Sequence, residues 1–178
     1  MMVDNAKAVT DEEIKISAEY FASVKYQPWV KVVETDSVPK TRVAGFMLVA
    51  PDERDVEPIG QRIIEIAQDV TRTTLRDSRS GFVAYVPIGS IKRGELLVTT
   101  GGRTKTTACA GCHGPGLRGL GDVPPLAGRS PSYTLRQLYD FQSGSRAGVL
   151  SAQMKQAVAR LTIDDMVSIS AYTASLSP

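Results

Sequence analysis

The feature that most constrains this chain is the position of its two cysteines and its single histidine, which all fall within five residues. They form the run Cys109-Ala110-Gly111-Cys112-His113. Two cysteines this close enclose too short a loop for a disulfide to stabilise a fold. We therefore expect the three side chains to serve a chemical role and not a structural cross-link.

The run matches the Cys-x-x-Cys-His pattern by which a c-type haem is attached. The two sulfurs add to the two vinyl groups of the porphyrin, and the histidine presents its imidazole to the iron. One turn of chain brings both sulfurs to one edge of the ring while the histidine faces its centre. The sequence thus predicts one covalently bound haem c held by Cys109, Cys112 and His113.

Three other interpretations of the motif remain open. A thioredoxin-like redox pair would follow a strand in a βαβ unit, whereas this motif follows the Gly/Thr-rich segment 99–104. A structural zinc site takes four ligands, and the motif supplies three. The motif could also be two free thiols and a surface histidine that share no function. The segment after the motif favours haem attachment.

That segment contains Pro124 and Leu126, in the run Val123-Pro124-Pro125-Leu126-Ala127-Gly128. An axial histidine usually donates its second ring N–H to a backbone carbonyl, which fixes its orientation and basicity. The carbonyl of Pro124 is well placed in the sequence for this role. We expect Leu126 to pack on the porphyrin.

The sixth iron ligand cannot be a second histidine from this chain, so a methionine thioether is the strongest candidate. Met154 and Met166 follow the motif. Met166 lies in a helix expected to start at Thr162, at helical spacing from Ile163 and Ile169, which favours a place in the core. Met154 precedes a short apolar run on a segment able to cross the open haem face. We therefore expect His113 and Met154 to be the two iron ligands.

The rest of the chain divides by its patterns. A helix is expected over residues 10–24, with Thr10 as N-cap and Glu13 completing a capping box. Short β-rich runs then alternate with Pro, Gly and Asp, and carry no motif for chemistry. These runs are residues 29–34, 43–49, 61–66 and 81–87. The chain is expected to be α+β, with an N-terminal helix in residues 1–26, a β-rich module in 27–88 and a helical domain in 89–178.

Three helices are expected in the last part. Ser90 is the expected N-cap of the first, and the other two begin at Ser130 and Thr162. Proline follows Ser130 at the first turn of its helix, and Gly144 ends that helix. Gly94 weakens a helix interior, which indicates close packing against another helix. Tyr172 is the aromatic side chain expected to lie over Gly94.

The N-terminal helix repeats the C-terminal one. When residues 10–14 are placed on residues 162–166, Tyr20 falls on Tyr172 and Met2 falls on Met154. The chain therefore begins like the tail of a second haem domain, from its ligand methionine onward. No attachment motif accompanies this copy.

Together these residues resemble the class I cytochromes c, in particular the dihaem type built from two such domains. The resemblance covers residues 89–178 and implies an all-α haem domain, here preceded by a helix and a β-rich module. It implies that Arg129 reaches a haem propionate and that Tyr133 and Gln137 line the pocket. This chain departs from the dihaem pattern because it has one attachment motif, and because residues 27–88 exceed the usual linker.

Electron transfer is the function expected from this resemblance. With His113 and Met154 as ligands, no position on the iron is open to oxygen or substrate, so we expect no enzymatic activity. The partners would be a donor and an acceptor redox protein, such as a membrane oxidase or reductase complex. A net charge of +2 without any Lys/Arg block argues against nucleic acid.

Haem attachment takes place in the bacterial periplasm, which is therefore the expected location. No apolar run approaches membrane-spanning length, and residues 1–5 lack the features of a secretory signal, so the signal is expected to be absent from this chain.

Three functional alternatives remain. The chain could be a haem subunit or fragment of a larger respiratory oxidoreductase, with the β-rich module as docking surface and residues 1–25 contacting a second polypeptide. It could be a haem sensor or catalytic haem protein with a weak or absent sixth ligand. It could also be a haem-free redox or metal protein that uses the cysteine pair.

Overall fold

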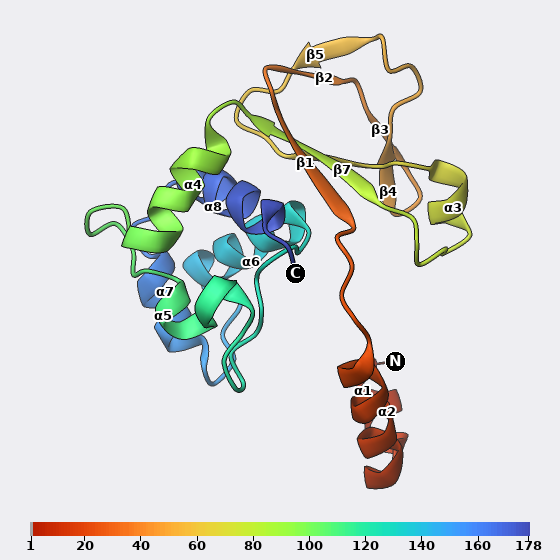
Figure 1. The fold of residues 1–178 in the computed structure, drawn as a ribbon, viewed down its shortest axis with the longest axis vertical. Coiled ribbons are helices and arrows are strands. Elements are labelled where there is room, and N and C mark those ends of the chain that lie inside the picture. The colour runs from red at the N-terminus through yellow and green to blue at the C-terminus, as the bar shows by residue number, and fades with distance from the viewer. Residues whose placement is uncertain (1) are drawn as a thin grey trace.

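The computed structural model describes residues 2–178, apart from the side chain of Met2. Two helices, α1 (Met2–Ala8) and α2 (Asp11–Ser23), stand apart from a β-sheet and a helical unit, to which an extended linker joins them (Figure 1). The mixed α+β class is as expected from the sequence. The placement of Met2 on Met154 concerns a side chain outside the described part.

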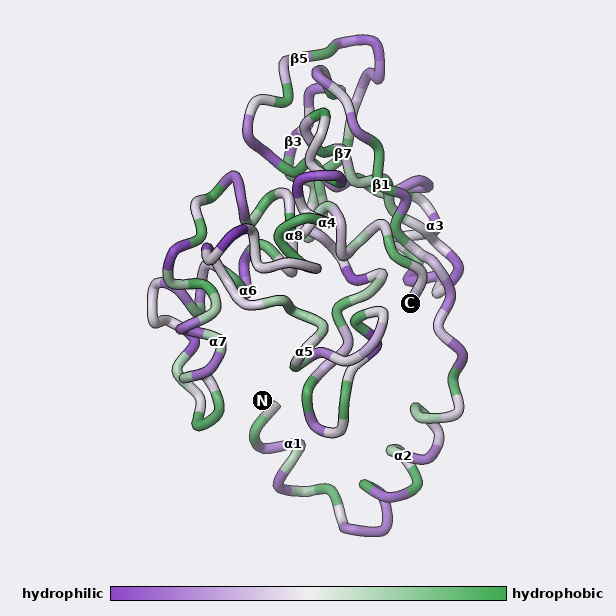
Figure 2. The backbone as a smooth tube through the Cα atoms, turned by 60° about the vertical axis from the view of Figure 1, so that its left-hand side comes forward, coloured by the Kyte–Doolittle hydropathy of each residue, from purple (hydrophilic) through white to green (hydrophobic). Residues whose placement is uncertain are grey.

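Helix α2 forms from local signals. Thr10 Oγ1 accepts a hydrogen bond from the Glu13 amide at 3.3 Å, and Glu13 Oε2 accepts one from the Thr10 amide at 2.9 Å. The predicted capping box is therefore confirmed. No residue of α2 is buried, and Ile14 and Phe21 are 52% and 71% exposed. Figure 2 shows hydrophobic segments along α2, which lies at the bottom of that view, below the sheet and the helical unit.

The central part is a five-stranded mixed sheet of order β1-β7-β6-β4-β3. β1 runs parallel to β7, β7 antiparallel to β6, β6 parallel to β4, and β4 antiparallel to β3. These strands are β1 (Val30–Thr35), β3 (Arg42–Ala44), β4 (Met47–Val49), β6 (Ile64–Ala67) and β7 (Phe82–Pro87). A two-stranded sheet, β2 (Ser37–Pro39) with β5 (Val56–Pro58), and the short helix α3 (Val70–Thr74) complete this part.

The predicted strands differ from the observed ones in one informative way. The run 43–49 is not one strand but the hairpin β3–β4, which turns at Gly45 with φ of +61°. The β-rich part has a small hydrophobic core of its own, formed by Val38, Ile59, Ile64 and Ile66. Residues 37–39 and 56–58 pair with each other across a long stretch of chain, so neither run is recognisable from local pattern alone.

The last part is helical, and its helices pack around one apolar cluster. They are α4 (Ser90–Thr100), α5 (Ala110–His113), the 3₁₀ turn η1 (Pro115–Leu117), α6 (Pro131–Ser143), α7 (Ser151–Val158) and α8 (Ile163–Ser175). α8 packs on both α4 and α6. No helix within residues 2–178 is long and apolar enough to cross a membrane.

The contact between α4 and α8 depends on Gly94. A Cβ at this position would overlap the backbone carbonyl of Ser168 and lie 2.7 Å from Cβ of Tyr172. Only glycine fits, and the predicted packing of Tyr172 over Gly94 is confirmed. The packing buries the core face of α8, including Met166, which is 0% exposed.

Two carboxylates of the sheet cap helices of the helical unit. Glu34 Oε1 on β1 accepts a hydrogen bond from the Ile91 amide at 2.8 Å. Glu65 Oε2 on β6 accepts one from Ser130 Oγ at 2.8 Å. The expected capping of α4 by Ser90 is wrong, because Ser90 is the first residue of that helix. The N-cap of α4 is Gly89, which makes no side-chain hydrogen bond to the helix.

A buried carboxylate joins α8 to α4 and to the loop before α5. Asp165 is 1% exposed and accepts hydrogen bonds of 2.6 Å each from Arg93 and Lys105. It also completes the capping box of α8 with Thr162. Burial by itself would raise the pKa of this carboxyl, but the hydrogen bonds that it accepts hold the pKa well below its usual range.

Asp165 therefore couples stability to pH. Because its pKa is lower in the folded than in the unfolded chain, its contribution is complete above the unfolded pKa of about 3.9 and is lost as pH falls below that value. We expect Asp165→Asn to lower the free energy of unfolding at pH 7 by about 1.5–3 kcal/mol. Urea denaturation should show this difference shrinking from pH 7 to pH 3. The exposed Asp122→Asn is the control, and equal losses for both variants would contradict the assignment.

Candidate functional site

The cysteines and the histidine lie on one helical turn. α5 starts after Cys109, and the His113 amide donates to the Cys109 carbonyl at 2.9 Å. The Cys109 amide donates in turn to the Val98 carbonyl of α4, also at 2.9 Å. Gly114 ends the turn with φ of +77°, where a Cβ would overlap the Gly119 carbonyl. The motif is thus anchored to α4 on one side and to a tight loop on the other.

Both thiols are free, Cys109 being half-buried and Cys112 exposed. Burial raises the pKa of the Cys109 thiol to about 11. A redox-active Cys-x-x-Cys pair depends on a lowered thiol pKa, so the thioredoxin-like interpretation is not supported. Within the described part of the chain, no three His, Cys, Asp or Glu side chains cluster as a metal site would require.

His113 is fixed by a single strong contact. Its side chain is 7% exposed, and Nδ1 lies 2.7 Å from the carbonyl oxygen of Pro124. A carbonyl only accepts, so Nδ1 carries the proton and donates, which leaves the lone pair of Nε2 free for a ligand bond. The structure therefore brings Pro124 to the position that the sequence indicated.

The segment that carries Pro124 folds back over the motif. The amides of Leu126 and Ala127 donate to the Leu117 carbonyl at 2.8 and 3.2 Å, and Arg129 Nε donates to the Pro125 carbonyl at 2.8 Å. Leu126 packs against the apolar cluster of the helical unit. These contacts hold the segment in one conformation beside His113.

The two candidate methionines occupy different environments. Met154 on α7 is partly buried and packs against the same apolar cluster as Cys109 and Leu126. Met166 on α8 lies at 0% exposure inside that cluster. Its thioether is enclosed by core packing, whereas Met154 is only partly buried against the cluster.

Arg129 and Tyr133 line one cavity of about 560 Å³. The linker side chains Tyr26 and Trp29 line the same cavity, as does Arg118. Sequence patterns did not mark these three, because the linker and the loop after the motif carry no periodic signal. The other lining residues are Pro125, Ala127, Gly128, Ser130 and Pro178.

Gln137 is not part of that cavity lining. Its Oε1 accepts a hydrogen bond from Arg146 at 2.6 Å, and the guanidinium of Arg146 stacks 4.5 Å from the ring centre of Phe141. Gln137 thus lies further along α6, where it fixes the loop that leads to α7.

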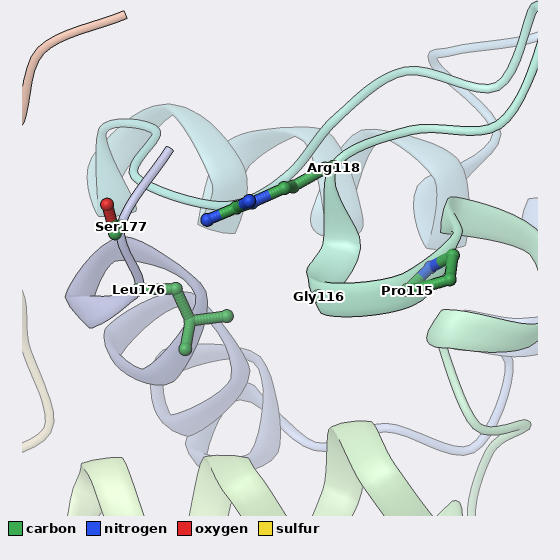
Figure 3. A pocket seen from close by; sticks show the side chains of 5 residues that line it. All are labelled: Pro115, Gly116, Arg118, Leu176 and Ser177. Carbon is green, nitrogen blue, oxygen red and sulfur yellow. The ribbon is translucent and has the colours of Figure 1, made fainter.

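A second cavity, of about 390 Å³, lies between η1 and the end of α8 (Figure 3). It is lined by Pro115, Gly116, Arg118, Leu176 and Ser177, and the Arg118 side chain extends toward Ser177. Arg118 therefore borders both cavities. None of the residues singled out from the sequence lines this one.

The donor set fits a c-type haem. Two free thiols three residues apart can form thioethers, an imidazole has one nitrogen held by a carbonyl and the other available, and a partly buried thioether lies at the same apolar cluster. Imidazole and thioether are the axial ligands typical of cytochromes c. The surrounding apolar side chains suit a porphyrin better than a hydrated ion.

No protein-family model matches the chain. Cytochrome c-554(547) of Halothiobacillus neapolitanus is 38% identical over 77 residues, which are 39% of this chain and 85% of that protein. The "Thiosulfate dehydrogenase electron acceptor" of Thiomonas intermedia strain K12 is 35% identical over 104 residues, 56% of this chain and 48% of that protein.

Among solved structures, reduced recombinant cytochrome c4 from Pseudomonas stutzeri matches with a TM-score of 0.45 and 34% identity, over 49% of this chain and 48% of that one. The chain spans about half the length of the curated relatives that it matches first, at 46% and 48%.

The two thiols should differ in reactivity in the haem-free folded chain. Since a thiol of pKa about 11 is almost fully protonated at pH 8, Cys109 should be alkylated by iodoacetamide at least about tenfold more slowly than Cys112. Peptide mass spectrometry at successive times measures both rates. In 6 M guanidinium the two rates should converge. Equal rates in the folded chain would contradict the burial of Cys109.

Proposed function

The chain belongs to the class I cytochromes c, and on this premise we propose that it transfers single electrons between redox proteins. Its cofactor is one covalent haem c, which supplies an iron that alternates between the ferric and ferrous states. Cys109 and Cys112 hold the porphyrin, and His113 and Met154 bind the iron. The observation that carries the proposal is the hydrogen bond from His113 to Pro124, on the same turn as two free thiols.

Each of these residues has a defined task. The Pro124 carbonyl keeps the His113 proton on Nδ1 and aims Nε2 at the iron. The Met154 thioether raises the reduction potential above that of a bis-histidine site. Leu126 and the apolar cluster exclude water from the ring. Arg129 and Tyr133, which line one cavity, would be the residues that hold the propionates.

We propose that the protein catalyses no reaction on a small molecule, since the two axial ligands leave no open position on the iron. Its location is extracytoplasmic, where c-type haem is attached. A redox protein delivers the electron and another accepts it. A dehydrogenase is a fitting donor, because one relative is itself a "Thiosulfate dehydrogenase electron acceptor".

The division into residues 1–26, 27–88 and 89–178 is likewise a proposal. Its support is the difference in burial between two helices of similar sequence. α2 and α8 share a capping box, yet Ile14 is 52% exposed where the corresponding Met166 is 0% exposed. The apolar face of α2 is therefore available to another polypeptide. This observation favours a second candidate function, that of a haem subunit within a larger respiratory oxidoreductase.

The haem and its ligands can be tested by spectroscopy and mass. The chain produced in a host competent in haem attachment should have the mass of the polypeptide plus one haem, a sharp reduced α-band and a ferric sulfur-to-iron band at the red end. Met154→Leu should abolish the red band and lower the reduction potential. Met166→Leu, which conserves volume in the core, should preserve both.

Three outcomes would contradict the proposal. A mass equal to the bare polypeptide would remove the cytochrome function. Loss of the red band in Met166→Leu, with retention in Met154→Leu, would exchange the ligand assignment. Carbon monoxide should leave the reduced spectrum unchanged, since a change would indicate an open axial position.

The unpartnered state of α2 has its own test. Ile14→Ala should change the free energy of unfolding by less than about 0.5 kcal/mol, because the side chain is exposed. The corresponding Met166→Ala should cost about 2–5 kcal/mol. Urea denaturation of the isolated chain measures both, and native mass spectrometry records its oligomeric state. A large cost for Ile14→Ala would mean that α2 is already packed in the isolated chain.

A further inference from the structure

We propose that Glu65, a residue of the sheet, is a positioning residue for the haem site of the helical unit. It acts by holding the start of α6, and thereby the segment between Pro124 and Tyr133. The inference rests on the proposed function, since it concerns the residues that face the haem. It also gives the sheet, which carries no chemical motif of its own, a part in the site.

The carboxylate of Glu65 binds the first turn of α6 directly. Its Oε2 accepts hydrogen bonds from Ser130 Oγ at 2.8 Å and from the Ser132 amide at 3.3 Å. Ser130 Oγ in turn accepts from the Tyr133 amide at 3.2 Å. A negative charge at a helix N-terminus is favoured by the unpaired amides and the helix dipole. Glu65 thus extends the cap that Ser130 alone would provide.

The other end of this segment is tied to the iron ligand. The Pro124 carbonyl accepts from His113 Nδ1 at 2.7 Å, and the Pro125 carbonyl accepts from Arg129 Nε at 2.8 Å. The Gly128 amide donates to the Thr173 carbonyl of α8 at 2.9 Å. The segment 124–133 is therefore held by hydrogen bonds at both ends, to His113 at its start and to Glu65 at its end. Releasing it from the sheet loosens the restraint on the acceptor of His113.

Glu34 offers a matched comparison within the same chain. It also lies on the sheet and also accepts a hydrogen bond from a helix N-terminus, that of Ile91 on α4, at 2.8 Å. The residues next to Ile91 include no candidate haem contact. Removing Glu34 weakens the junction between sheet and helices without touching the segment 124–133.

The experiment uses the full haem-loaded chain with Glu65→Ala, Glu65→Gln and Glu34→Ala. Two quantities are measured, the midpoint reduction potential and the hydrogen exchange rate of the Tyr133 amide. Glu65→Ala should shift the midpoint reduction potential away from the wild-type value. It should also speed the exchange of the Tyr133 amide about tenfold, since losing a hydrogen bond to a charged group changes an opening equilibrium by a factor of that order. Glu65→Gln keeps an acceptor oxygen and should restore most of both values. Glu34→Ala should leave both at the wild-type level.

Two results would overturn the proposal. One is a wild-type potential and exchange rate in Glu65→Ala. The other is an equal displacement in Glu34→Ala, which would mean general loosening of the junction. Failure of the proposed function is distinguishable, because it appears as a chain without haem. In that case the exchange of the Tyr133 amide in the haem-free chain still tests the contact of Glu65 with α6.

Discussion

The hydrogen bond from His113 to the carbonyl of Pro124 is the contact on which the site depends. It fixes the tautomer and the direction of the imidazole, and it joins the helical turn of the motif to the segment that returns across it. The rest of the helical unit holds these two pieces in place. The amide of Cys109 is hydrogen-bonded to α4, and the amide of Gly128 is hydrogen-bonded to α8. Helix α8 in turn packs on α4 across Gly94.

At the junction between the sheet and the helical unit, a carboxylate caps α4, which has no side-chain cap of its own, and another adds to the cap that Ser130 gives α6. Glu34 and Glu65 reach the first turns of α4 and α6 from strands far away in the sequence. Unpaired amides at a helix start need an acceptor, and a carboxylate satisfies them more strongly than a hydroxyl. The sheet is therefore connected to the helices that frame the site, whereas α1 and α2 stand free of both (Figure 1).

The similarity to known proteins covers different shares of different relatives. The chain covers 85% of the short cytochrome c-554(547) but only about half of the relatives that it matches first. The proposed division into a haem-binding unit and a helix that resembles the tail of another starts from the single motif and from the exposed helix α2. Helix α2 has the pattern of a packed helix, yet no residue of it is buried. Its exposed face is the reason to expect a partner polypeptide.

The sequence by itself determined whatever rests on neighbours a few residues apart. The motif sits on one turn, Thr10 and Thr162 cap their helices through residues three positions on, and the role of Gly94 was evident from its place in a helix. Tertiary structure alone decided that Glu34 and not Ser90 caps α4, that residues 43–49 turn at Gly45, and that Tyr26 and Trp29 share a cavity with Arg129. Such contacts join residues distant in the chain, and no local periodicity records which distant partner burial and hydrogen bonding will select.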